Sequence, residues 1–173
     1  MKKIILPLTI LALIFAAAPL FAADSVLGYW KTIDDETGKA KSVIAIYEYQ
    51  GKIFGRILMT FEDDGTTVKD SIYVKRDKAN KVKGTPPYCG LDIIYNLVDT
   101  GSKFSKGNIL DPLTGKVYAS DVWKDKNGNL IVKGKIGPIG KSQVWKPFSV
   151  SEFPPGFTVP DSKTFVPVIA ATK

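Results

Sequence analysis

Apolar and polar positions alternate in short runs along this chain, and the clearest example spans residues 42–60. This segment reads SVIAIYEYQGKIFGRILMT, two β-branched and aromatic runs separated by Gln50-Gly51. Two turn residues ending in glycine, placed between two such runs, are typical of a tight hairpin, because glycine adopts positive φ without strain. The pattern therefore predicts a β-hairpin that turns at Gln50-Gly51.

A register follows if Tyr49 lies opposite Lys52, because side chains alternate between the two faces of a strand pair. One face then carries Tyr47 with Phe54, Ala45 with Arg56, and Val43 with Leu58, and the other carries Ile46 with Gly55 and Ile44 with Ile57. Both faces are apolar, whereas a strand pair with one wet face alternates more cleanly. We therefore expect a closed barrel whose outer face is also partly covered.

Further strand-forming runs follow this hairpin at intervals of about 8–12 residues, which is typical of an all-β barrel or sandwich. Gly28 and Trp30 begin an earlier strand, and the later runs lie at 71–75, 91–98, 116–123, 130–136 and 142–148. Clusters of Asp, Asn, Gly and Pro separate the runs, and no segment after residue 23 has a 3.6-residue apolar period. The fold class predicted is all-β.

The two ends of the chain differ from this pattern. Lys2 and Lys3, a nearly unbroken apolar run from residue 4 to residue 20, and small residues up to Ala23 are typical of a secretory signal. An uncleaved anchor helix is the alternative, but Pro7 and Pro19 interrupt the run and no basic cluster follows it. We expect cleavage after Ala22 or Ala23, a β-barrel domain over residues 24–150, and an exported protein, periplasmic or secreted, with no stable membrane span.

The last segment, residues 151–173, is predicted to be an extended, Pro-rich extension. It holds four of the chain's 11 prolines, and proline cannot join a central strand. Its apolar stretch from Phe165 to Ile169 either lies along the barrel or meets a partner.

The amino-acid composition limits the kinds of binding and catalytic site that the chain can form. The chain carries a net charge of +7, or +5 without residues 1–23, which hold two of the 24 Lys and Arg and none of the 17 Asp and Glu. The lysines are scattered, with the densest run at residues 75–78, so we expect no nucleic-acid partner. The chain has no His and one Cys, which excludes imidazole bases, Ser-His and Cys-His pairs, and zinc sites built from Cys and His. No cofactor and no metal are expected.

Cys89 cannot form an internal disulfide. We expect it to be a small apolar residue at the entrance of a strand.

Carboxylates remain as catalytic candidates, since a facing pair separated by about 5–9.5 Å can hydrolyse glycosides. The acids at 34–36 and Asp111 belong to predicted turns. Asp121, close to Trp123 on one strand face, is the acid expected to point inward.

Residues 133–141, KGKIGPIGK, place glycines three apart between lysines. This spacing has some likeness to a phosphate cradle, but no helix follows and Pro138 lacks a backbone donor. We predict a hairpin that joins two strands.

Aromatic residues in the strand runs either fill the core or line a cavity. Arg56 shares a face with Tyr47 and Phe54 in the predicted register, and a charge inside a barrel needs a partner, either a ligand anion or an acid such as Asp121. The candidate ligand-binding residues are Trp30, Tyr47, Phe54, Arg56, Tyr118, Asp121, Trp123 and Trp145.

Three blocks of the chain resemble a bacterial family known as domain of unknown function 2147: GYWKTIDDETGKAKSVIAIYEYQGKIFGRI, GNILDPLTGKVYASDVW and VKGKIGPIGKSQVW, in this order between Val26 and Trp145. Gly28-x-Trp30 also resembles the opening motif of lipocalin-like barrels, where the Trp plugs one end of the cavity. The resemblance implies a lipocalin-like antiparallel barrel, of about 8–10 strands, with Trp30 at its floor. This chain departs from the family's frequent cysteine pair and from its Arg-rich ending, where Lys141 and Lys146 stand.

Three functions are compatible with these observations. The first is a non-enzymatic exported barrel that binds a small apolar or amphipathic molecule. The second is a cell-envelope interaction protein that uses its outer face and the 151–173 extension. The third is a carboxylate enzyme, which would require Asp111 and Asp121 to share a cleft.

Overall fold

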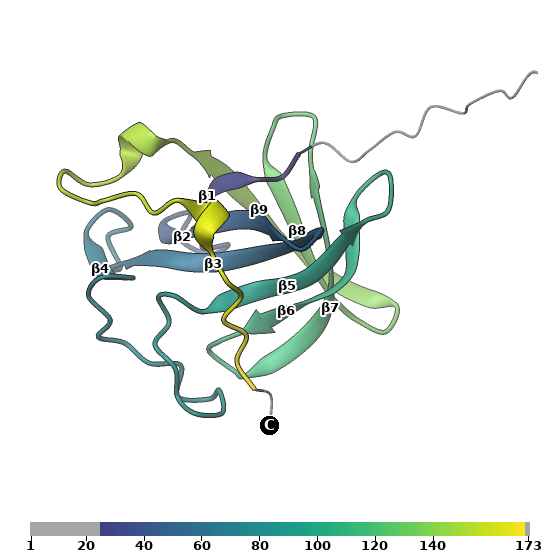
Figure 1. Ribbon diagram of the computed structural model, residues 1–173, viewed down its shortest axis with the longest axis horizontal. Helices are drawn as coiled ribbons and strands as arrows, with labels where there is room; N and C mark the ends of the chain where they lie inside the picture. Colours follow the sequence, from purple (N-terminus) through teal and green to yellow (C-terminus); the bar gives the residue numbers. More distant parts are fainter. Residues whose placement is uncertain (1–24, 172–173) are drawn as a thin grey trace, which may run out of the picture.

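The computed structural model describes residues 25–171, so the predicted signal peptide lies outside the described residues. These residues form nine strands followed by two short 3-10 helices (Figure 1). The strands are β1 (Gly28–Ile33), β2 (Ala40–Tyr49), β3 (Lys52–Phe61), β4 (Val68–Ser71), β5 (Asp92–Asp99), β6 (Phe104–Asp111), β7 (Lys116–Lys124), β8 (Leu130–Ile136) and β9 (Ile139–Phe148), and the helices are η1 (Val150–Glu152) and η2 (Ser162–Thr164). Neither helix is long and apolar enough to cross a bilayer.

Eight of these strands close into an antiparallel barrel. The sheet runs β2-β1-β9-β8-β7-β6-β5-β3-β4, and an additional pairing between β2 and β3 closes the ring. β4 pairs only with β3 and lies outside the closed ring. The predicted all-β barrel of about 8–10 strands is therefore confirmed.

The β2–β3 hairpin has nearly the predicted register. Tyr47 pairs with Phe54, Ala45 with Arg56 and Ile44 with Ile57, and the turn residues Gln50 and Gly51 have φ values of 51° and 73°. The exception is Val43, which pairs with Met59 because a β-bulge shifts the register by one residue.

One end of the barrel is filled by side chains that point inward. Trp30 is 5% exposed, and its indole Nε1 donates a hydrogen bond to the Val26 carbonyl oxygen at 2.9 Å. Leu97, Phe104 and Leu130 belong to the same buried cluster. Burial of these groups closes this end to solvent and gives the barrel its main core.

The outer face of the β2–β3 hairpin is covered, as its apolar composition predicted. Val43, Ala45 and Leu58 are fully buried there, and Phe153 and Phe165 of the C-terminal extension pack against this cluster. Figure 1 shows the extension, in yellow, crossing in front of the barrel before it reaches the C-terminus. The structure therefore places the extension along the barrel.

Two strand predictions need correction. The strand predicted at 71–75 lies instead at Val68–Ser71, because the Ser71 hydroxyl accepts hydrogen bonds from the Tyr73 and Val74 amides and begins a turn. β6 was not predicted. Its polar sequence is broken by a bulge in which Lys106 has a φ of 61°, so the period-two pattern is lost.

Candidate functional site

A cavity opens at the barrel end opposite Trp30 and extends into the interior. Its volume is about 1120 Å³, and it is open to solvent at its mouth. The inner part is lined by buried apolar side chains from five strands, namely Ile57, Ile93, Leu110, Val132 and Trp145. These residues make a hydrophobic base, because each is apolar and at least nine-tenths buried.

Glycine at position 134 helps to keep this space open. A Cβ there would meet Ile109 Cγ2 at 3.5 Å and Tyr118 Cβ at 3.6 Å, which is ordinary van der Waals contact. Gly55 is different, because a Cβ there would lie 2.9 Å from Ile46 Cδ1 and 3.0 Å from Ile94 Cβ. The barrel is therefore tightly packed at Gly55 and has unfilled room at Gly134.

A row of hydroxyl groups crosses the cavity wall above the apolar base. Thr32, Ser42 and Thr60 are paired neighbours on β1, β2 and β3, and all three line the cavity. The Thr32 and Ser42 hydroxyls lie 2.8 Å apart and share a hydrogen bond. The Thr60 Oγ1 is buried and has no hydrogen-bond partner within residues 25–171.

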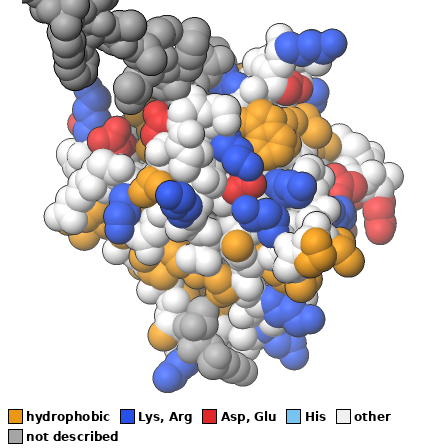
Figure 2. Space-filling view, turned by 90° about the vertical axis from the view of Figure 1, so that its right-hand side faces the viewer, with side chains coloured by type: hydrophobic (Ala, Val, Ile, Leu, Met, Phe, Trp, Pro, Cys, Tyr) orange, Lys and Arg blue, Asp and Glu red, His pale blue; other side chains and the backbone are white. Residues whose placement is uncertain are grey.

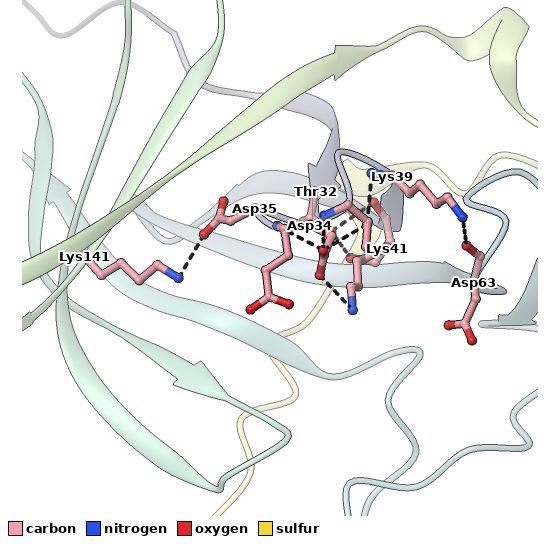
Figure 3. Close-up of polar contacts among 10 residues, drawn as sticks. Thr32, Asp34, Asp35, Lys39, Lys41, Asp63 and Lys141 are labelled. Carbon is pink, nitrogen blue, oxygen red and sulfur yellow. Dashed lines mark hydrogen bonds and ion pairs between the residues drawn. The ribbon is translucent and has the colours of Figure 1, made fainter.

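Charged side chains surround the mouth (Figure 3). Asp34 accepts hydrogen bonds from the Thr37 amide and hydroxyl, and its carboxylate lies 2.9 Å from Lys41 Nζ. The contact with Lys41, followed by those with Thr37, holds the pKa of Asp34 well below its usual range. Lys141 reaches Asp35 from β9 at 2.9 Å, and this contact raises the pKa of Lys141.

The mouth has a further ion pair between Lys69 and Asp77, at 2.8 Å. Asp111 accepts from the Leu113 amide and the Thr114 hydroxyl, as expected of an acid that begins its own turn. Within residues 25–171, His, Cys, Asp and Glu do not gather in a group of three or more that could hold a metal ion. The cavity therefore offers an apolar base, hydroxyl groups on its wall and an ionic rim.

Two of the candidate ligand-binding residues, Tyr118 and Trp145, line this cavity. Trp145 is 1% exposed, and its Nε1 donates to Gln143 Oε1 at 3.2 Å. Trp30 belongs to the core cluster at the closed end and is not among the lining residues.

Tyr47, Phe54 and Arg56 do not line the cavity, which corrects their expected position. Alternation along β2 and β3 turns Ile46 and Gly55 inward, so these three side chains lie on the outer face. They lie beneath the C-terminal extension there. The Arg56 guanidinium stacks 4.4 Å from the centre of the Phe165 ring, and its Nη2 donates to the Val166 carbonyl oxygen at 2.5 Å.

Asp92, which the sequence pattern did not single out, is the acid that pairs with Arg56. Arg56 Nη2 lies 2.7 Å from Asp92 Oδ2, and Tyr47 donates its hydroxyl to the same oxygen at 2.9 Å. The Val168 amide also donates to Asp92, at 2.5 Å. The sequence does contain a signal that could have identified Asp92: it is an acid at the start of the apolar run 91–98, and a buried arginine needs a buried acid as its partner.

Asp121 and Trp123 also lie outside the cavity, because Ser120 and Val122 take the inward positions on β7. The Asp121 carboxylate accepts hydrogen bonds from Lys103 and Lys135, each at 2.7 Å. Burial alone would raise the pKa of Asp121, but these two ammonium groups outweigh it and the pKa is lowered. Asp111 and Asp121 therefore do not share a cleft.

Cys89 is 1% exposed and precedes β5, in the position expected of a small apolar residue. Burial raises the pKa of its thiol to about 12, and the nearby Asp70 adds to the effect. The thiol is therefore protonated at neutral pH and unsuited to nucleophilic chemistry.

Comparison with protein families gives one match over residues 28–147, to a family described as uncharacterized proteins conserved in bacteria, DUF2147. The chain belongs to this family. Among solved structures, it is similar to protein HP1028 from Helicobacter pylori, described as belonging to the lipocalin family, with a TM-score of 0.58 and 22% identity over 74% of this chain and 86% of the other. No curated protein matches. At this identity, the likeness supports a lipocalin-like fold for this DUF2147 member.

Proposed function

We propose that this DUF2147 protein binds a small amphipathic molecule inside its barrel. The observation that carries the proposal is the cavity of about 1120 Å³ with an apolar base and a polar wall. Ligand cavities in proteins commonly measure roughly 300–1,000 Å³ and combine hydrophobic lining with a few polar groups. The volume here includes the open mouth and is large enough for a molecule of that class.

The lining indicates how such a molecule would be oriented. Its hydrocarbon part would contact Ile57, Val132 and Trp145, because this part of the wall has no charged side chain to desolvate. Its polar end would lie near the hydroxyl row, where Thr60 Oγ1 is free to accept or donate a hydrogen bond. The binding residues that we propose are therefore Ile57, Thr60, Tyr118, Val132 and Trp145.

Replacement of Gly134 by leucine tests this proposal. The added side chain would enter the cavity without backbone strain, because a Cβ at this position meets its neighbours at 3.5 Å or more. We expect the affinity for the neutral fluorescent probe N-phenyl-1-naphthylamine to fall at least about tenfold, since lost burial of that size corresponds to about 1.4 kcal/mol. The measurement is a fluorescence titration of the purified protein.

The matched control is Ala119→Leu. Ala119 is an exposed residue of the adjacent strand β7, paired with Lys135, and it is not among the cavity-lining residues. This variant adds the same side chain outside the barrel, and it should bind the probe as the original protein does. Equal probe binding by Gly134→Leu and Ala119→Leu would reject the interior site.

The same proposal includes export, which rests on Lys2, Lys3, the apolar run and the small residues up to Ala23. The intact mass of the protein recovered from its own cells tests it. A mass that corresponds to a chain beginning at residue 23 or 24 supports export, and a mass that retains the apolar run contradicts it.

The alternative function as an interaction protein has less support. The ring of Phe153 stacks on Phe157, and Phe165 contacts Tyr47, so these aromatic groups of the extension are already in contact with its own fold. Val166 and Val168, 64% and 50% exposed, remain available on the outer side. Scattered exposed valines are ordinary on protein surfaces and do not by themselves mark an interface.

A further inference from the structure

The β8–β9 hairpin carries two large aliphatic side chains in solvent at its tip. Ile136 is 68% exposed and Ile139 is 75% exposed, although they pair with each other across the tip. Gly137, with a φ of 57°, and Pro138 form the turn between them. The tip residues from Ile136 to Gly140 are all exposed, so the tip has no apolar partner within the described part of the protein.

Lysines flank this apolar tip. The segment from Leu130 to Phe148 contains four lysines and no acidic residue. Lys133 extends along β9 towards the tip over Gly140, where a Cβ would lie only 2.5 Å from Lys133 Cε. The absence of a side chain at Gly140 therefore lets this basic group lie near the turn.

Neighbouring acids neutralise these lysines only in part. Asp121 binds Lys135, and it also binds Lys103. The pair between Lys141 and Asp35 joins side chains that are 79% and 44% exposed, so water and salt weaken it. Lys133 lies opposite Asp121 in the β7–β8 register, but among residues 25–171 no acid makes an ion pair with it.

The tip lies beside the entrance of the cavity. Ile136, Ile139 and Lys141 belong both to the hairpin and to the residues that surround the mouth. Figure 2 looks at the side of the molecule where this hairpin projects in Figure 1, and it shows Lys and Arg side chains grouped near exposed hydrophobic ones. Apolar and basic groups therefore occur together on this side.

We propose that the β8–β9 tip, defined as Lys133, Lys135, Ile136, Pro138, Ile139 and Lys141, docks onto the surface of an anionic phospholipid bilayer. The two isoleucines enter the boundary between headgroups and acyl chains, and the lysines contact the anionic headgroups. This arrangement uses both exposed apolar area and positive charge, whereas a polyanion in solution would use the charge alone. The docking does not depend on the proposed ligand site.

The remaining mouth residues define the orientation of the docked protein. Asp63 lies at the mouth on the β3–β4 loop, and an anionic surface repels it. The β1–β2 loop stays beside the tip, because its Asp35 pairs with Lys141. The molecule is therefore tilted, with the β8–β9 side on the bilayer and the β3–β4 loop away from it. The cavity entrance then lies next to the headgroups.

Sedimentation of the protein with vesicles tests the docking. The vesicles contain either phosphatidylcholine alone or phosphatidylcholine with about one-third phosphatidylglycerol, a proportion that gives a clearly negative surface. We expect binding to the anionic vesicles, little to the neutral ones, and weaker binding at high salt. The double variant Ile136→Ser/Ile139→Ser should lower the partition coefficient about tenfold or more, because the inserted aliphatic area is lost. Lys133→Gln should lower it about three- to fivefold through one lost surface charge.

Matched controls separate the tip from general effects of the substitutions. Val150→Ser removes an aliphatic side chain that is 61% exposed outside the hairpin, and Lys126→Gln removes an exposed lysine in the β7–β8 turn. Both controls should bind vesicles as the original protein does. Equal loss in the tip and control variants, or no binding of the original protein to anionic vesicles, would overturn the proposal.

Two further readouts separate bilayer docking from a change in stability or in probe binding. Thermal unfolding should give the same Tm for the double variant, since both isoleucines are exposed. Probe titration of Lys133→Gln without vesicles should give the original affinity, because Lys133 is not among the cavity-lining residues. If heparin were bound as strongly by the double variant as by the original protein while neither bound vesicles, the tip would be a polyanion site and the proposal would be wrong. Failure of the original protein to bind the probe, with its vesicle binding intact, would reject the interior ligand site alone.

Discussion

Thr60 and Thr32 occupy the same hydroxyl row but differ in their hydrogen bonds. Thr32 Oγ1 shares a hydrogen bond with Ser42 Oγ at 2.8 Å, whereas Thr60 Oγ1 is buried without a partner among the described residues. A buried hydroxyl that makes no hydrogen bond has lost its hydration without compensation. The Thr60 hydroxyl therefore lowers the stability of the fold, and residues that do so are often found in binding sites.

Replacement of each threonine by valine separates these two cases. We expect Thr60→Val to leave the free energy of unfolding unchanged or to raise it by up to about 1 kcal/mol, and Thr32→Val to lower it by about 1 kcal/mol. Urea denaturation followed by tryptophan fluorescence gives both values. If Thr60→Val were the more destabilising of the two, the hydroxyl would have an unrecognised partner in the free protein.

The thiol of Cys89 is expected to be unreactive in the folded protein. Its pKa of about 12 leaves almost no thiolate at pH 8, and the side chain is 1% exposed. Labelling with a disulfide reagent should therefore proceed only at the rate of unfolding, and at once in denaturant. Rapid labelling of the native protein at pH 8 would contradict this burial.

The same thiol contributes to the dependence of stability on pH. Because burial raises its pKa from 9.0 to about 12, the unfolded chain releases this proton first, and the free energy of unfolding falls as the pH rises between these values. This group should lower the free energy of unfolding by about 1.4 kcal/mol in total between pH 8 and pH 10, because the unfolded thiol is only partly ionised over most of that range. Cys89→Ala should remove this loss, as measured by urea denaturation from pH 8 to pH 10.

At the scale of elements, the ion pair between Arg56 and Asp92 joins β3, β5 and the C-terminal extension. The Arg56 side chain is 11% exposed and that of Asp92 is fully buried. Asp92→Ala leaves the guanidinium without its partner, and we expect the free energy of unfolding to fall by about 3–5 kcal/mol. Chemical denaturation measures this change.

The matched control is an exposed pair at the mouth. Asp77→Ala removes the partner of Lys69, where the side chains are 39% and 45% exposed, and it should cost less than about 1 kcal/mol. The double variant Arg56→Met/Asp92→Leu should recover much of the loss, because no charge is left buried. A double variant as unstable as Asp92→Ala would show that the charge itself is not the cause.

The sequence predicted elements well where apolar alternation was regular and poorly where a bulge or a side-chain turn interrupted it. β8 has the predicted bounds, and the β2–β3 hairpin has the predicted pairs up to the bulge at Val43. The bulge at Lys106 hid β6, and the Ser71 turn ends β4 at the residue where the predicted strand began. The first failure comes from a bulge that breaks the period of two, and the second from side-chain hydrogen bonding that competes with the strand pattern.

The site was harder to predict, because the two faces of the hairpin look alike in sequence. Tyr47 and Ile46 are both apolar, so composition alone does not say which one points inward, and a one-residue choice exchanges every side chain between core and exterior. The covering extension makes the outer face apolar as well. Trp145 and Tyr118 do line the cavity, whereas Asp121 and Trp123, on the same strand as Tyr118, face outward.

At the scale of the whole molecule, the C-terminal extension is part of the folded domain. Phe165 packs against Tyr47, Val166 accepts a hydrogen bond from Arg56, and the Asp92 amide donates to Val168 at 2.9 Å. Deletion of residues 165–173 should therefore lower the free energy of unfolding by about 3 kcal/mol or more, since hydrogen bonds to charged groups contribute roughly 1.5–3 kcal/mol each. Urea denaturation and far-ultraviolet circular dichroism measure the change, with the barrel spectrum retained.

Deletion of residues 171–173 alone is the control for this truncation. These residues follow the contacts with Arg56 and Asp92, so stability should be unchanged. If both truncations had the same denaturation midpoint, the extension would contribute nothing to the fold.

The closed barrel was predictable from the spacing of strands and turns, but the presence of a cavity was not. Whether the interior is filled depends on the sizes of side chains that meet on the inner wall, such as Gly134 on β8 beside Tyr118 on β7 and Ile109 on β6. Those neighbours come from separate strands. To predict which side chains become neighbours, one needs the pairing register of all the strands, and local sequence patterns do not provide it.

The closure between β1 and β9 has a consequence for biosynthesis. Tyr29, Trp30 and Lys31, near the start of the described chain, pair with Phe148, Pro147 and Lys146, and the Arg56–Asp92 pair is capped by residues 166–168. A ribosome must therefore release almost the whole polypeptide before the ring can close. The first and last strands of the barrel can therefore pair only after both have left the ribosome.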